Sequence, residues 1–474
     1  MYYKPQDGWT GDPIPFYDGK EFRLFYLKTS RTGEHFSDVA WNMVSTPDFV
    51  HYHDDVPTGI EGGTGSVIQA DGDYHLFYCD NSRPEKQLTC HALSRDLVHW
   101  KKLPEDTFEA DGGIYEKPNW RDPHVLWNES AGEFWMLTAG RTAGGTNRCG
   151  CTGLCVSRDL RRWEFRQPLF APHIDVGAHE CPDLFRIGGW WYLTYSTYTG
   201  FYATVYRMSR SPEGPWLIPE RETLDSRAFY AGKTVQKDGE VYLVGWNPTR
   251  EAAYCPGWNP AGAGGHDYDT FDWGGNLIVH RLRQNEDGTL RVGIPGSVDT
   301  YLSRESGFSL RTLTGAWRQE GDSFVSADDG YSLLSAAPLP KLCKISFDLK
   351  FDASMRRCGV ALRIDGRADK GYYLTFDRQY HRIAFSSYLM ETLDGWLRIP
   401  YMTELERPLL LKDDTLYHVC VVVDDTIGEV YVNDEVAMSF RMYDLTDGAW
   451  GLFSLGRGTV FSNISLRGPV ESAL

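Results

Sequence analysis

Three acidic residues stand in short motifs of types that can perform acid–base chemistry. Asp12 lies in GDPIPF, Asp122 in RDPHVL and Glu180 in ECPDLF. Cleavage of a glycosidic bond needs one ionised carboxylate, which attacks or activates water, and one protonated carboxyl, which assists the leaving oxygen. Burial and mutual repulsion separate the two pKa values so that both forms coexist near neutrality. A third, charged acid can hold sugar hydroxyls and stabilise an oxocarbenium ion.

A repeat indicates the fold that would bring these acids together. A short strand, a turn that usually contains glycine and an aromatic-rich strand recur five times, at intervals of 50 to 59 residues. The copies start at Phe16, Ile68, Leu126, Phe185 and Val235. Asp-Gly and Gly-Gly between strands favour hairpins, because glycine accepts positive φ. A second element follows in four copies: STPDFVHY, LSRDLVHW, VSRDLRRW and MSRSPEGPW. Four strands per unit predict a five-bladed β-propeller, and a stacked solenoid fits this pattern less well.

The repeat also predicts where the acids lie. In a propeller the first strand of each blade runs along the central channel, so matching positions converge on the axis. Asp12 lies four residues before the first repeat start, Asp122 four before the third and Glu180 five before the fourth. Singly, each has a simpler interpretation: a turn residue before proline, a salt bridge to Arg121, and a solvated strand end. Three like charges in one funnel are costly without a purpose, so the coincidence favours catalysis.

The chain changes character after about residue 300. Alternating segments such as ISFDLKFD, GVALRID and HVCVVVDD are separated by turns rich in Gly, Asp and Asn. This pattern is typical of an antiparallel β-sandwich. We therefore expect an all-β protein with a propeller domain over 1–297 and a sandwich domain over 298–474. The sandwich could bind polysaccharide or serve only as structure, and we favour the structural role.

Composition and charge exclude several functions. The formal net charge is -17, which repels phosphate backbones and anionic lipid, so we expect neither a nucleic-acid nor a membrane partner. No basic, apolar leader opens the sequence and no run of 18 apolar residues occurs, which predicts a cytoplasmic protein. Aromatic residues make up 14% of the chain. Most should form the core, and a minority could line a carbohydrate site.

No motif indicates a cofactor or a metal. The chain has no Gly-rich phosphate loop and no His-x-x-x-His pair. Cys149, Cys151 and Cys155 have C-x-C-x3-C spacing but lack a second cysteine or histidine pair, so reduced thiols are the preferred interpretation. His91, His179 and His266 are scattered, which favours hydrogen bonding or sugar contact over metal binding. We expect no cofactor, and the sequence does not predict the oligomeric state.

The acidic motifs, in this order, resemble those of glycoside hydrolase family 32, the invertases, fructanases and fructosidases. The family shows Asp-Pro, then Arg-Asp-Pro, then Glu-Cys, as the chain does at Asp12-Pro13, Arg121-Asp122-Pro123 and Glu180-Cys181. Further segments are similar to family motifs. They are GTGS from Gly63, DSRAFYAGKT from Asp225, WGGNL from Trp273 and EVYVND from Glu429. The resemblance covers nearly the whole chain.

The resemblance implies roles for individual residues. Asp12 would be the nucleophile, Glu180 the acid/base and Asp122 the transition-state stabiliser of a retaining enzyme, with a covalent intermediate on Asp12. Arg121 and Asp183 would orient sugar or tune the acid. The full set of implied sugar-binding residues is Trp9, Trp41, Ser66, Arg121, Asp183, Tyr230 and Trp273.

Two departures from the family pattern concern the sugar pocket. The family's Trp-Met-Asn-Asp-Pro-Asn-Gly is here Trp9-Thr10-Gly11-Asp12-Pro13-Ile14-Pro15, so Gly11 replaces an asparagine. Ala40-Trp41-Asn42 stands where a Trp-Gly-His motif is usual. We therefore expect a fructosidase-like hydrolase that acts poorly on plain sucrose. The alternatives are a related propeller glycosidase on another sugar such as an arabinoside, a transglycosylase, a non-catalytic sugar-binding protein and a protein-interaction propeller.

Overall fold

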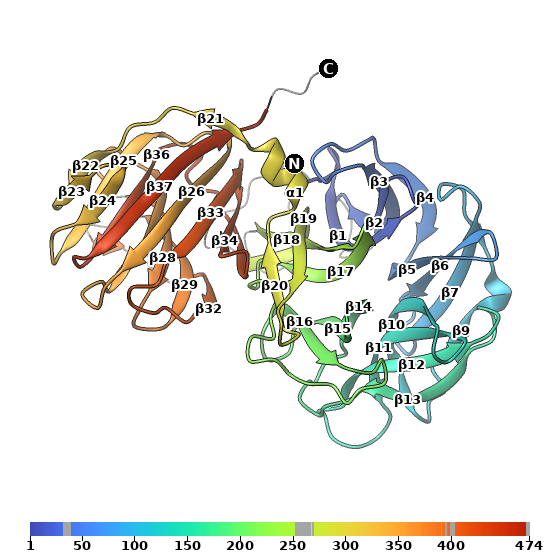
Figure 1. The fold of residues 1–474 in the computed structure, drawn as a ribbon. Helices are drawn as coiled ribbons and strands as arrows, with labels where there is room; N and C mark the ends of the chain where they lie inside the picture. The colour runs from blue at the N-terminus through green and yellow to red at the C-terminus, as the bar shows by residue number, and fades with distance from the viewer. Residues whose placement is uncertain are drawn as a thin grey trace. The chain divides into compact units, whose positions relative to one another are not determined.

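The computed structural model describes residues 1–31, 39–251, 267, 270–368, 370–389, 391–393, 396–398 and 403–470. Nearly all regular structure in these residues is β-strand (Figure 1). The chain divides into two compact units, Met1–Ala263 with Thr270–Leu290 and Gly264–Asp269 with Arg291–Leu474. The domain boundary expected after residue 297 remains a prediction, and the helix α1 (Gly296–Tyr301) spans it.

The five sequence repeats correspond to five antiparallel hairpins of the first unit. The hairpins are β1–β2 (Trp9–Tyr17, Phe22–Thr29), β5–β6 (Gly63–Ala70, Asp73–Asp80), β10–β11 (Tyr115–Asn128, Glu133–Thr142), β14–β15 (Glu180–Ile187, Trp190–Thr197) and β17–β18 (Tyr230–Lys237, Glu240–Glu251). Figure 1 looks into this unit with the first strand of each hairpin nearest its centre. The expected β-propeller is confirmed.

Further strands extend each hairpin outward. They are β3 (Ala40–Thr46), β4 (Val56–Glu61), β7 (Leu88–Ser94), β8 (Lys101–Lys102), β9 (Phe108–Glu109), β12 (Gly150–Ser157), β13 (Glu164–Phe170), β16 (Ala203–Ser209), β19 (Thr270–Gln284) and β20 (Leu290–Gly293), with a short 3-10 helix over Pro104–Asp106. Thr10 of β1 pairs with Gly275 of β19, so the first and last groups of strands form one sheet in the order β17-β18-β19-β1-β2-β3-β4. Because this sheet is continuous, the number of five blades remains a prediction.

The innermost strands share a β-bulge. The register shifts between Gly11 and Ile14 in β1, and equivalent shifts occur in β5, β10, β14 and β17. In four of these strands the bulge holds a non-glycine residue with positive φ. These residues are Asp12 at 41°, Asp122 at 57°, Cys181 at 49° and Ala231 at 53°. Each stands four residues before its repeat start. Such backbone is costly for L-residues, and it is concentrated at functional sites.

The second sequence element forms the turn after the third strand. In the first copy the Thr46 hydroxyl accepts hydrogen bonds from the backbone N–H groups of Asp48 and Phe49. The Asp48 carboxylate accepts two more from Val50 and His51. Ser94 and Ser157, the second residues of the next two copies, make the same contacts together with Asp96 and Asp159. Side chains that bond their own backbone stabilise such turns.

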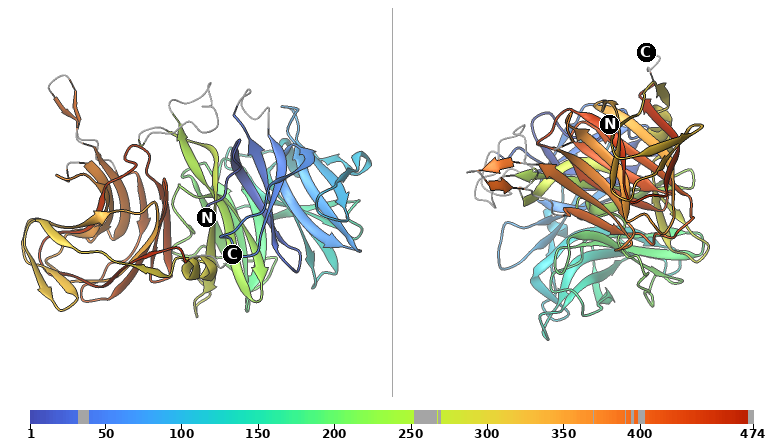
Figure 2. Two further views of the ribbon diagram at one scale, coloured as in Figure 1. Left: turned by 90° about the horizontal axis from the view of Figure 1, so that it is seen from above. Right: turned by 90° about the vertical axis from the view of Figure 1, so that its left-hand side faces the viewer.

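The second unit consists of two larger antiparallel sheets, which confirms the expected sandwich. One sheet has the order β23-β24-β37-β26-β33-β34-β35, and the other has the order β22-β25-β36-β27-β28-β29-β32. Figure 2 shows the separate hairpin β30–β31 (Glu391–Leu393, Trp396–Arg398) projecting from the rest of this unit.

The strands of the first sheet are β23 (Trp317–Glu320), β24 (Ser323–Ser326), β37 (Thr459–Gly468), β26 (Leu342–Phe351), β33 (Tyr417–Asp424), β34 (Ile427–Val432) and β35 (Val436–Arg441), with β21 (Arg304–Ser306) beside β37. Those of the second are β22 (Arg311–Thr314), β25 (Tyr331–Pro338), β36 (Ala449–Leu455), β27 (Arg357–Ile364), β28 (Lys370–Asp377), β29 (Arg382–Leu389) and β32 (Leu405–Pro408). Burial alternates along parts of strands such as β26 and β33, as expected for period-two patterning.

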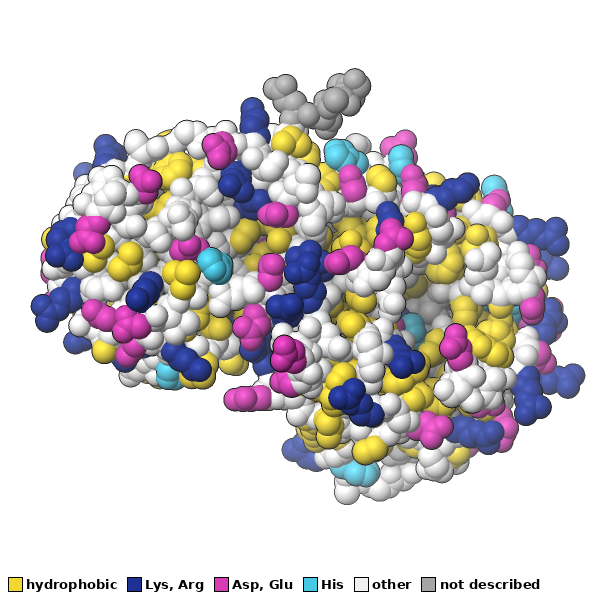
Figure 3. Space-filling model, in the orientation of Figure 1, with side chains coloured by type: hydrophobic (Ala, Val, Ile, Leu, Met, Phe, Trp, Pro, Cys, Tyr) yellow, Lys and Arg dark blue, Asp and Glu magenta, His cyan; other side chains and the backbone are white. Residues whose placement is uncertain are grey.

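Charge is dispersed over the surface. Figure 3 shows acidic and basic side chains interspersed on the face in view. No helix among the described residues is long and apolar enough to cross a membrane. The expected location in the cytoplasm remains a prediction.

Candidate active site

Asp12 lies in the bulge of β1, where its carboxyl meets residues from other strands. Trp246 of β18 donates its indole N–H to Oδ1 of Asp12 at 3.1 Å. The hydroxyl of Thr64 donates to the Asp12 backbone carbonyl at 3.3 Å. Burial, together with the charges of Asp122 and Glu180, raises the pKa of Asp12 to about 7. The side chain is therefore poised to change protonation near neutrality.

Asp122 occupies the equivalent bulge of β10 and is 5% exposed. The backbone N–H of Cys181 donates to Oδ2 of Asp122 at 3.0 Å, which joins the two bulges. Arg121 Nε lies 4.0 Å from the same oxygen. Burial raises the pKa of Asp122, while the Arg121 charge opposes that shift and the Glu180 charge adds to it.

Glu180 begins β14 one residue before the bulge and keeps 23% of its side chain exposed. Arg121 donates Nη2 to Oε1 of Glu180 at 2.8 Å, and Tyr230 donates its hydroxyl to Oε2 at 2.7 Å. The Tyr230 ring stacks on Tyr202 with centroids 3.9 Å apart. Two fixed donors hold the carboxyl group in one orientation.

The structure thus brings Asp12, Asp122, Glu180, Arg121 and Tyr230 together at the centre of the propeller. Their mutual influence on pKa reports this proximity, because the Asp12 pKa responds to Asp122 and to Glu180. Figure 3 shows the surface hollowed where the innermost strands converge in Figure 1.

A buried cation balances part of this negative charge. Lys233 of β17 is 2% exposed, and its Nζ donates to the backbone carbonyl of Gly65 at 2.5 Å. Its charge lowers the pKa of both Asp12 and Asp122. Sequence reasoning did not single out Lys233, although it lies in the DSRAFYAGKT segment. A lysine two residues before the start of the fifth repeat was the available signal.

Two aromatic residues near the site also escaped the sequence analysis. Trp246 was visible only as the end of VYLVGW, and Tyr202 lies in a turn without a motif. Burial and the charges of Glu180 and Asp12 raise the pKa of Tyr202 well above its usual value, so its hydroxyl stays protonated.

Asp183 faces the interior between strands. Its Oδ2 accepts hydrogen bonds from the backbone N–H and the hydroxyl of Thr234, both at 2.6 Å. Its Oδ1 lies 3.1 Å from Nε2 of His124. Burial lowers the pKa of His124 to about 4, so the ring is neutral near pH 7. In this structure Asp183 links β14 to β10 and β17, and the sugar contact that the resemblance implied for it remains a prediction.

Trp273 explains why residue 11 is glycine. A Cβ at Gly11 would lie 2.3 Å from Cζ2 of the Trp273 ring. The ring also lies beside Trp246, with centroids 6.0 Å apart. A tryptophan from β19 therefore fills the space of a side chain at residue 11, beside Trp246, which hydrogen-bonds Asp12.

The remaining expected sugar-binding residues are mostly interior. Trp41 is 0% exposed, lies in a core cluster and donates its indole N–H to the carbonyl of Gly63 at 2.9 Å. Ser66 accepts from the backbone N–H of Val125 at 2.9 Å, which ties β5 to β10. Trp9 is 7% exposed, with the Arg31 guanidinium 5.0 Å from the ring centroid. None of these three presents a large surface in this structure, and their sugar-binding roles remain predictions.

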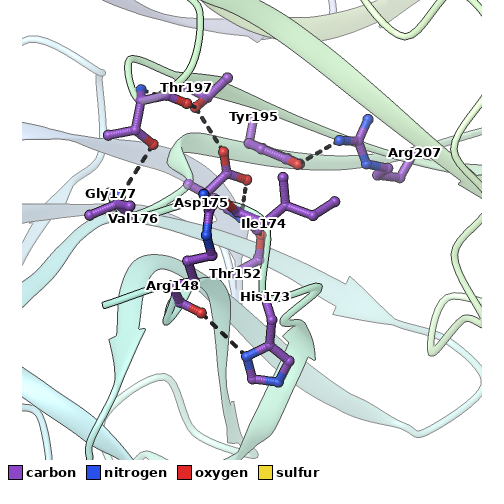
Figure 4. Close-up of polar contacts among 12 residues, drawn as sticks. Arg148, Thr152, His173, Ile174, Asp175, Val176, Gly177, Tyr195, Thr197 and Arg207 are labelled. Carbon is purple, nitrogen blue, oxygen red and sulfur yellow. Dashed lines mark hydrogen bonds and ion pairs between the residues drawn. The ribbon is translucent and has the colours of Figure 1, made fainter. Parts of the chain in front are cut away.

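A buried polar chain fixes the segment that leads into Glu180. Asp175 accepts hydrogen bonds from Thr197 and from His179, each at 3.1 Å, and the other nitrogen of His179 lies 3.0 Å from the Thr152 hydroxyl. The His179 ring stacks on Tyr195, with centroids 3.9 Å apart. Figure 4 shows Thr197 directed at Asp175, and Tyr195 meeting Arg207. His179 immediately precedes Glu180, so this series of hydrogen-bonded side chains positions the start of β14.

The other cysteines and histidines form no metal centre among the described residues. Burial raises the pKa values of Cys149, Cys151 and Cys155, which favours the thiol form. His91 hydrogen-bonds His75 and Asp106. His266 lies outside the described residues.

A propeller with carboxylates, an arginine and a tyrosine hydroxyl together at its centre has the side chains that glycoside hydrolysis requires. Comparison with known families agrees. Residues 2–263 match the model of the glycosyl hydrolases family 32 N-terminal domain. The chain belongs to glycosyl hydrolase family 32, and the protein is a glycoside hydrolase.

Individual relatives are distant but cover nearly the whole chain. The chain is 25% identical to a sucrose-6-phosphate hydrolase of Escherichia coli, over 94% of this chain and 88% of that protein. It resembles the structure of sucrose-6-phosphate hydrolase from Lactobacillus gasseri with a TM-score of 0.72 at 16% identity, over 99% of this chain and 93% of that chain. The exo-inulinase of Aspergillus awamori gives 0.73 at 16%, over 99% and 98%.

Proposed function

We propose that the protein is a retaining hydrolase of β-fructosides, with Asp12 as nucleophile, Glu180 as acid/base and Asp122 as stabiliser of the transition state. The observation that carries the proposal is the convergence of the three acids, coupled through the Asp12 pKa and anchored by Arg121 and the Cys181 N–H. The names of the relatives, which concern sucrose 6-phosphate and inulin, support a fructoside as the substrate.

In the first step an ionised Asp12 oxygen attacks the anomeric carbon and forms the glycosyl–enzyme bond. The bond from that carbon to the leaving oxygen breaks, and Glu180 gives this oxygen its proton. Asp122, held by the Cys181 N–H, accepts hydrogen bonds from sugar hydroxyls as positive charge develops on the ring.

In the second step water replaces the leaving group. The ionised Glu180 takes one proton from water, the water oxygen bonds to the anomeric carbon, and the Asp12 carboxylate departs. Two displacements at one carbon retain its configuration. Arg121 and Tyr230 keep Glu180 directed at the same position in both steps.

Before substrate binds, the acids together hold the proton that the first step requires. With the Asp12 pKa at about 7, the coupled acids hold a proton near neutrality. Arg121 and Tyr230 both donate to the Glu180 carboxyl group before substrate binds. We infer that arrival of the leaving oxygen beside Glu180 moves the shared proton from Asp12 to Glu180, without any net uptake.

The substrate is proposed to be a small β-fructoside other than plain sucrose. Trp273 fills the space next to Asp12 where the family asparagine would stand, and Gly11 offers no side-chain hydrogen bond. Sites that hydrogen-bond a hydroxyl discriminate strongly against ligands that fit them poorly, so this exchange should change selectivity by orders of magnitude.

The test compares kcat/KM for sucrose, sucrose 6-phosphate, 1-kestose, inulin and nitrophenyl glycosides that include an α-arabinofuranoside. NMR of the first product formed reports its anomeric configuration. We expect a β-fructoside to be preferred over sucrose, with retention. Release of the inverted sugar would contradict the roles given to Asp12 and Glu180, and preference for the arabinoside would contradict the fructoside assignment.

The role of Glu180 has its own test. Glu180→Gln should slow glycosylation most for poor leaving groups, because only these need the proton. Added azide should then accelerate breakdown of the intermediate formed from an activated aryl substrate. Equal losses in the glycosylation step for activated and natural substrates would show that Glu180 is not the acid.

A further inference from the structure

The sandwich unit carries a pocket of about 560 Å³ on one sheet. It lies on the sheet β22-β25-β36-β27-β28-β29-β32, on the face turned away from the sandwich interior. In β27 Arg357 is exposed and lines the pocket, whereas the next residue, Cys358, is fully buried, as expected for successive side chains that point to opposite faces of a sheet. The volume falls within the roughly 300–1,000 Å³ typical of small-ligand sites.

Strand register makes this pocket a continuous surface. Tyr331, Leu455, Arg357, Asp377 and Arg382 form one row across five strands, because each pairs with the next. The neighbouring row of the same face runs through Phe453 and Gly359 to Thr375 and Ala384. Residues that lie opposite one another on antiparallel strands have side chains about 4.5–5.5 Å apart at Cβ, so each row presents its groups together.

The centre of the pocket lacks a side chain, and aromatic residues lie at its sides. Gly359 has φ +155°, and a Cβ there would lie 1.9 Å from the carbonyl oxygen of Leu374, so no side chain fills the centre. Phe453 lies beside both tyrosines of the pocket, with its ring centroid 5.3 Å from that of Tyr373 and 6.1 Å from that of Tyr331. Tyr331 is 39% exposed, so part of its ring is open to a ligand.

The charged residues that line the pocket are Arg357, Arg382 and Asp377, and Glu406 outside the lining pairs with Arg382, so the charges in and beside the pocket are balanced. Arg357 donates Nε to the buried Asp377 at 3.1 Å, and Arg382 forms an ion pair with Glu406 and lies 3.8 Å from Asp377. Two guanidinium groups therefore face two carboxylates. No described residue hydrogen-bonds to the terminal nitrogens of Arg357, and its side chain is 44% exposed. The pocket offers N–H donors without a net charge that would select an ion.

We propose that this face of the sandwich is a second carbohydrate-binding site, separate from the propeller site and specific for neutral sugar chains. The exposed part of the Tyr331 ring accepts the apolar face of a sugar ring, while the terminal N–H groups of Arg357 donate to sugar hydroxyls. Charge balance disfavours phosphate and carboxylate ligands. The site would keep the protein close to a polymeric source of the small fructosides that the propeller site is proposed to hydrolyse. The role in hydrolysis rests on the proposed function, but the binding itself does not.

The test measures binding by the full chain with turnover blocked by Asp12→Asn. Native gels cast with inulin, levan, xylan or dextran report retardation of the protein. We expect retardation by at least one polymer, with the apparent Kd raised about tenfold or more by Tyr331→Ala and by Arg357→Met. The control is Arg318→Met, which removes an exposed arginine that does not line the pocket and should leave retardation unchanged.

Three results would overturn the site. They are no retardation by any of the four polymers, retardation that survives both pocket substitutions, and calorimetric binding of inorganic phosphate that Arg357→Met abolishes while no polymer binds. Thermal melts check that each variant is folded. With Asp12 intact, the two pocket variants should keep the parent kcat/KM on 1-kestose. If the parent protein hydrolysed no fructoside, that result would contradict the proposed function but not the second binding site, because the gel measures binding independently of turnover.

Discussion

Asp12 and Asp122 are themselves the left-handed residues of their bulges, whereas Glu180 precedes Cys181, which takes that conformation in its strand. Glu180 therefore leaves the backbone from a different point, and its longer side chain reaches Arg121 and Tyr230. Two aspartates at equivalent points and a glutamate displaced by one residue form an asymmetric set. That asymmetry allows one sugar to meet different carboxylates on its different sides.

The raised pKa of Asp12 predicts how stability depends on pH. Burial and the neighbouring acids raise it from 3.8 to about 7. Between these values the folded protein retains a proton that the unfolded chain releases, so stability falls as pH rises through this window. Asp12→Asn removes the loss of folding free energy that accompanies ionisation of this buried carboxyl. Its melting temperature should exceed that of the parent by several degrees at pH 8 and match it near pH 4.

Calorimetry at the two pH values checks this, with the exposed Glu105→Gln as control. The same difference in melting temperature at both pH values would contradict a proton-linked origin. Turnover should be lost in Asp12→Asn at every pH, because an amide cannot act as the nucleophile.

Gly11 and Trp273 should behave as a coupled pair. Gly11→Asn forces the Trp273 ring aside, and such overpacking costs about 1–3 kcal/mol. The loss should be much smaller in a Trp273→Ala background, where the space is open. A double-mutant cycle on the free energy of unfolding gives the coupling. Additive losses would show that Trp273 does not exclude a side chain at residue 11.

At the scale of elements, the polar chain before β14 should matter to catalysis through Glu180. Asp175→Asn removes the charge that holds His179, the residue next to Glu180. Burial opposes ionisation of Asp175, but the hydrogen bond and charge of His179 lower its pKa overall, so the contact is intact at neutral pH. We expect kcat to fall about tenfold on natural substrates while KM changes little.

Combining Asp175→Asn with Glu180→Gln distinguishes a positioning role of Asp175 from a simple loss of stability. In that background Asp175→Asn should have no further effect on turnover. The control is Asp159→Asn, which alters an aspartate that also accepts two hydrogen bonds, here from the backbone N–H groups of Arg161 and Arg162 in an outer turn. A further tenfold loss in the double variant would mean that Asp175 acts independently of Glu180.

At the scale of the molecule, the two units should unfold separately if each core is sufficient. Leu137→Ala in the propeller and Leu362→Ala in the sandwich each delete a fully buried side chain, which costs about 2–5 kcal/mol. Each should lower only one of two calorimetric transitions. One transition that both variants lower equally would show a single cooperative unit, and would contradict the proposed division into two domains.

Periodicity accounts for what the sequence could predict at this scale. The spacing of hairpin turns located the innermost strands, and counting back from each repeat start found two of the acids in register and the third one residue earlier. The sequence period did not predict the direction in which individual side chains point. Trp41 and Asp183 fit sugar-site motifs but point into the interior. Lys233 is buried beside the bulge of β17, and its charge lowers the pKa values of Asp12 and Asp122. The clash that makes residue 11 glycine joins positions too distant for any local pattern.

The pairing of Thr10 with Gly275 has a consequence for how the protein is made. The Thr10 hydroxyl donates to the carbonyl of a residue 265 positions later, at 2.9 Å. At about 5–20 residues per second, a ribosome needs roughly 15–50 s to supply that partner. Throughout this time the free edge of β1 is open to the wrong strand, either from the same nascent chain or from a neighbouring one. Ring closure is thus a late event in biosynthesis, and chaperones that shield strand edges should associate with this nascent chain until β19 has emerged.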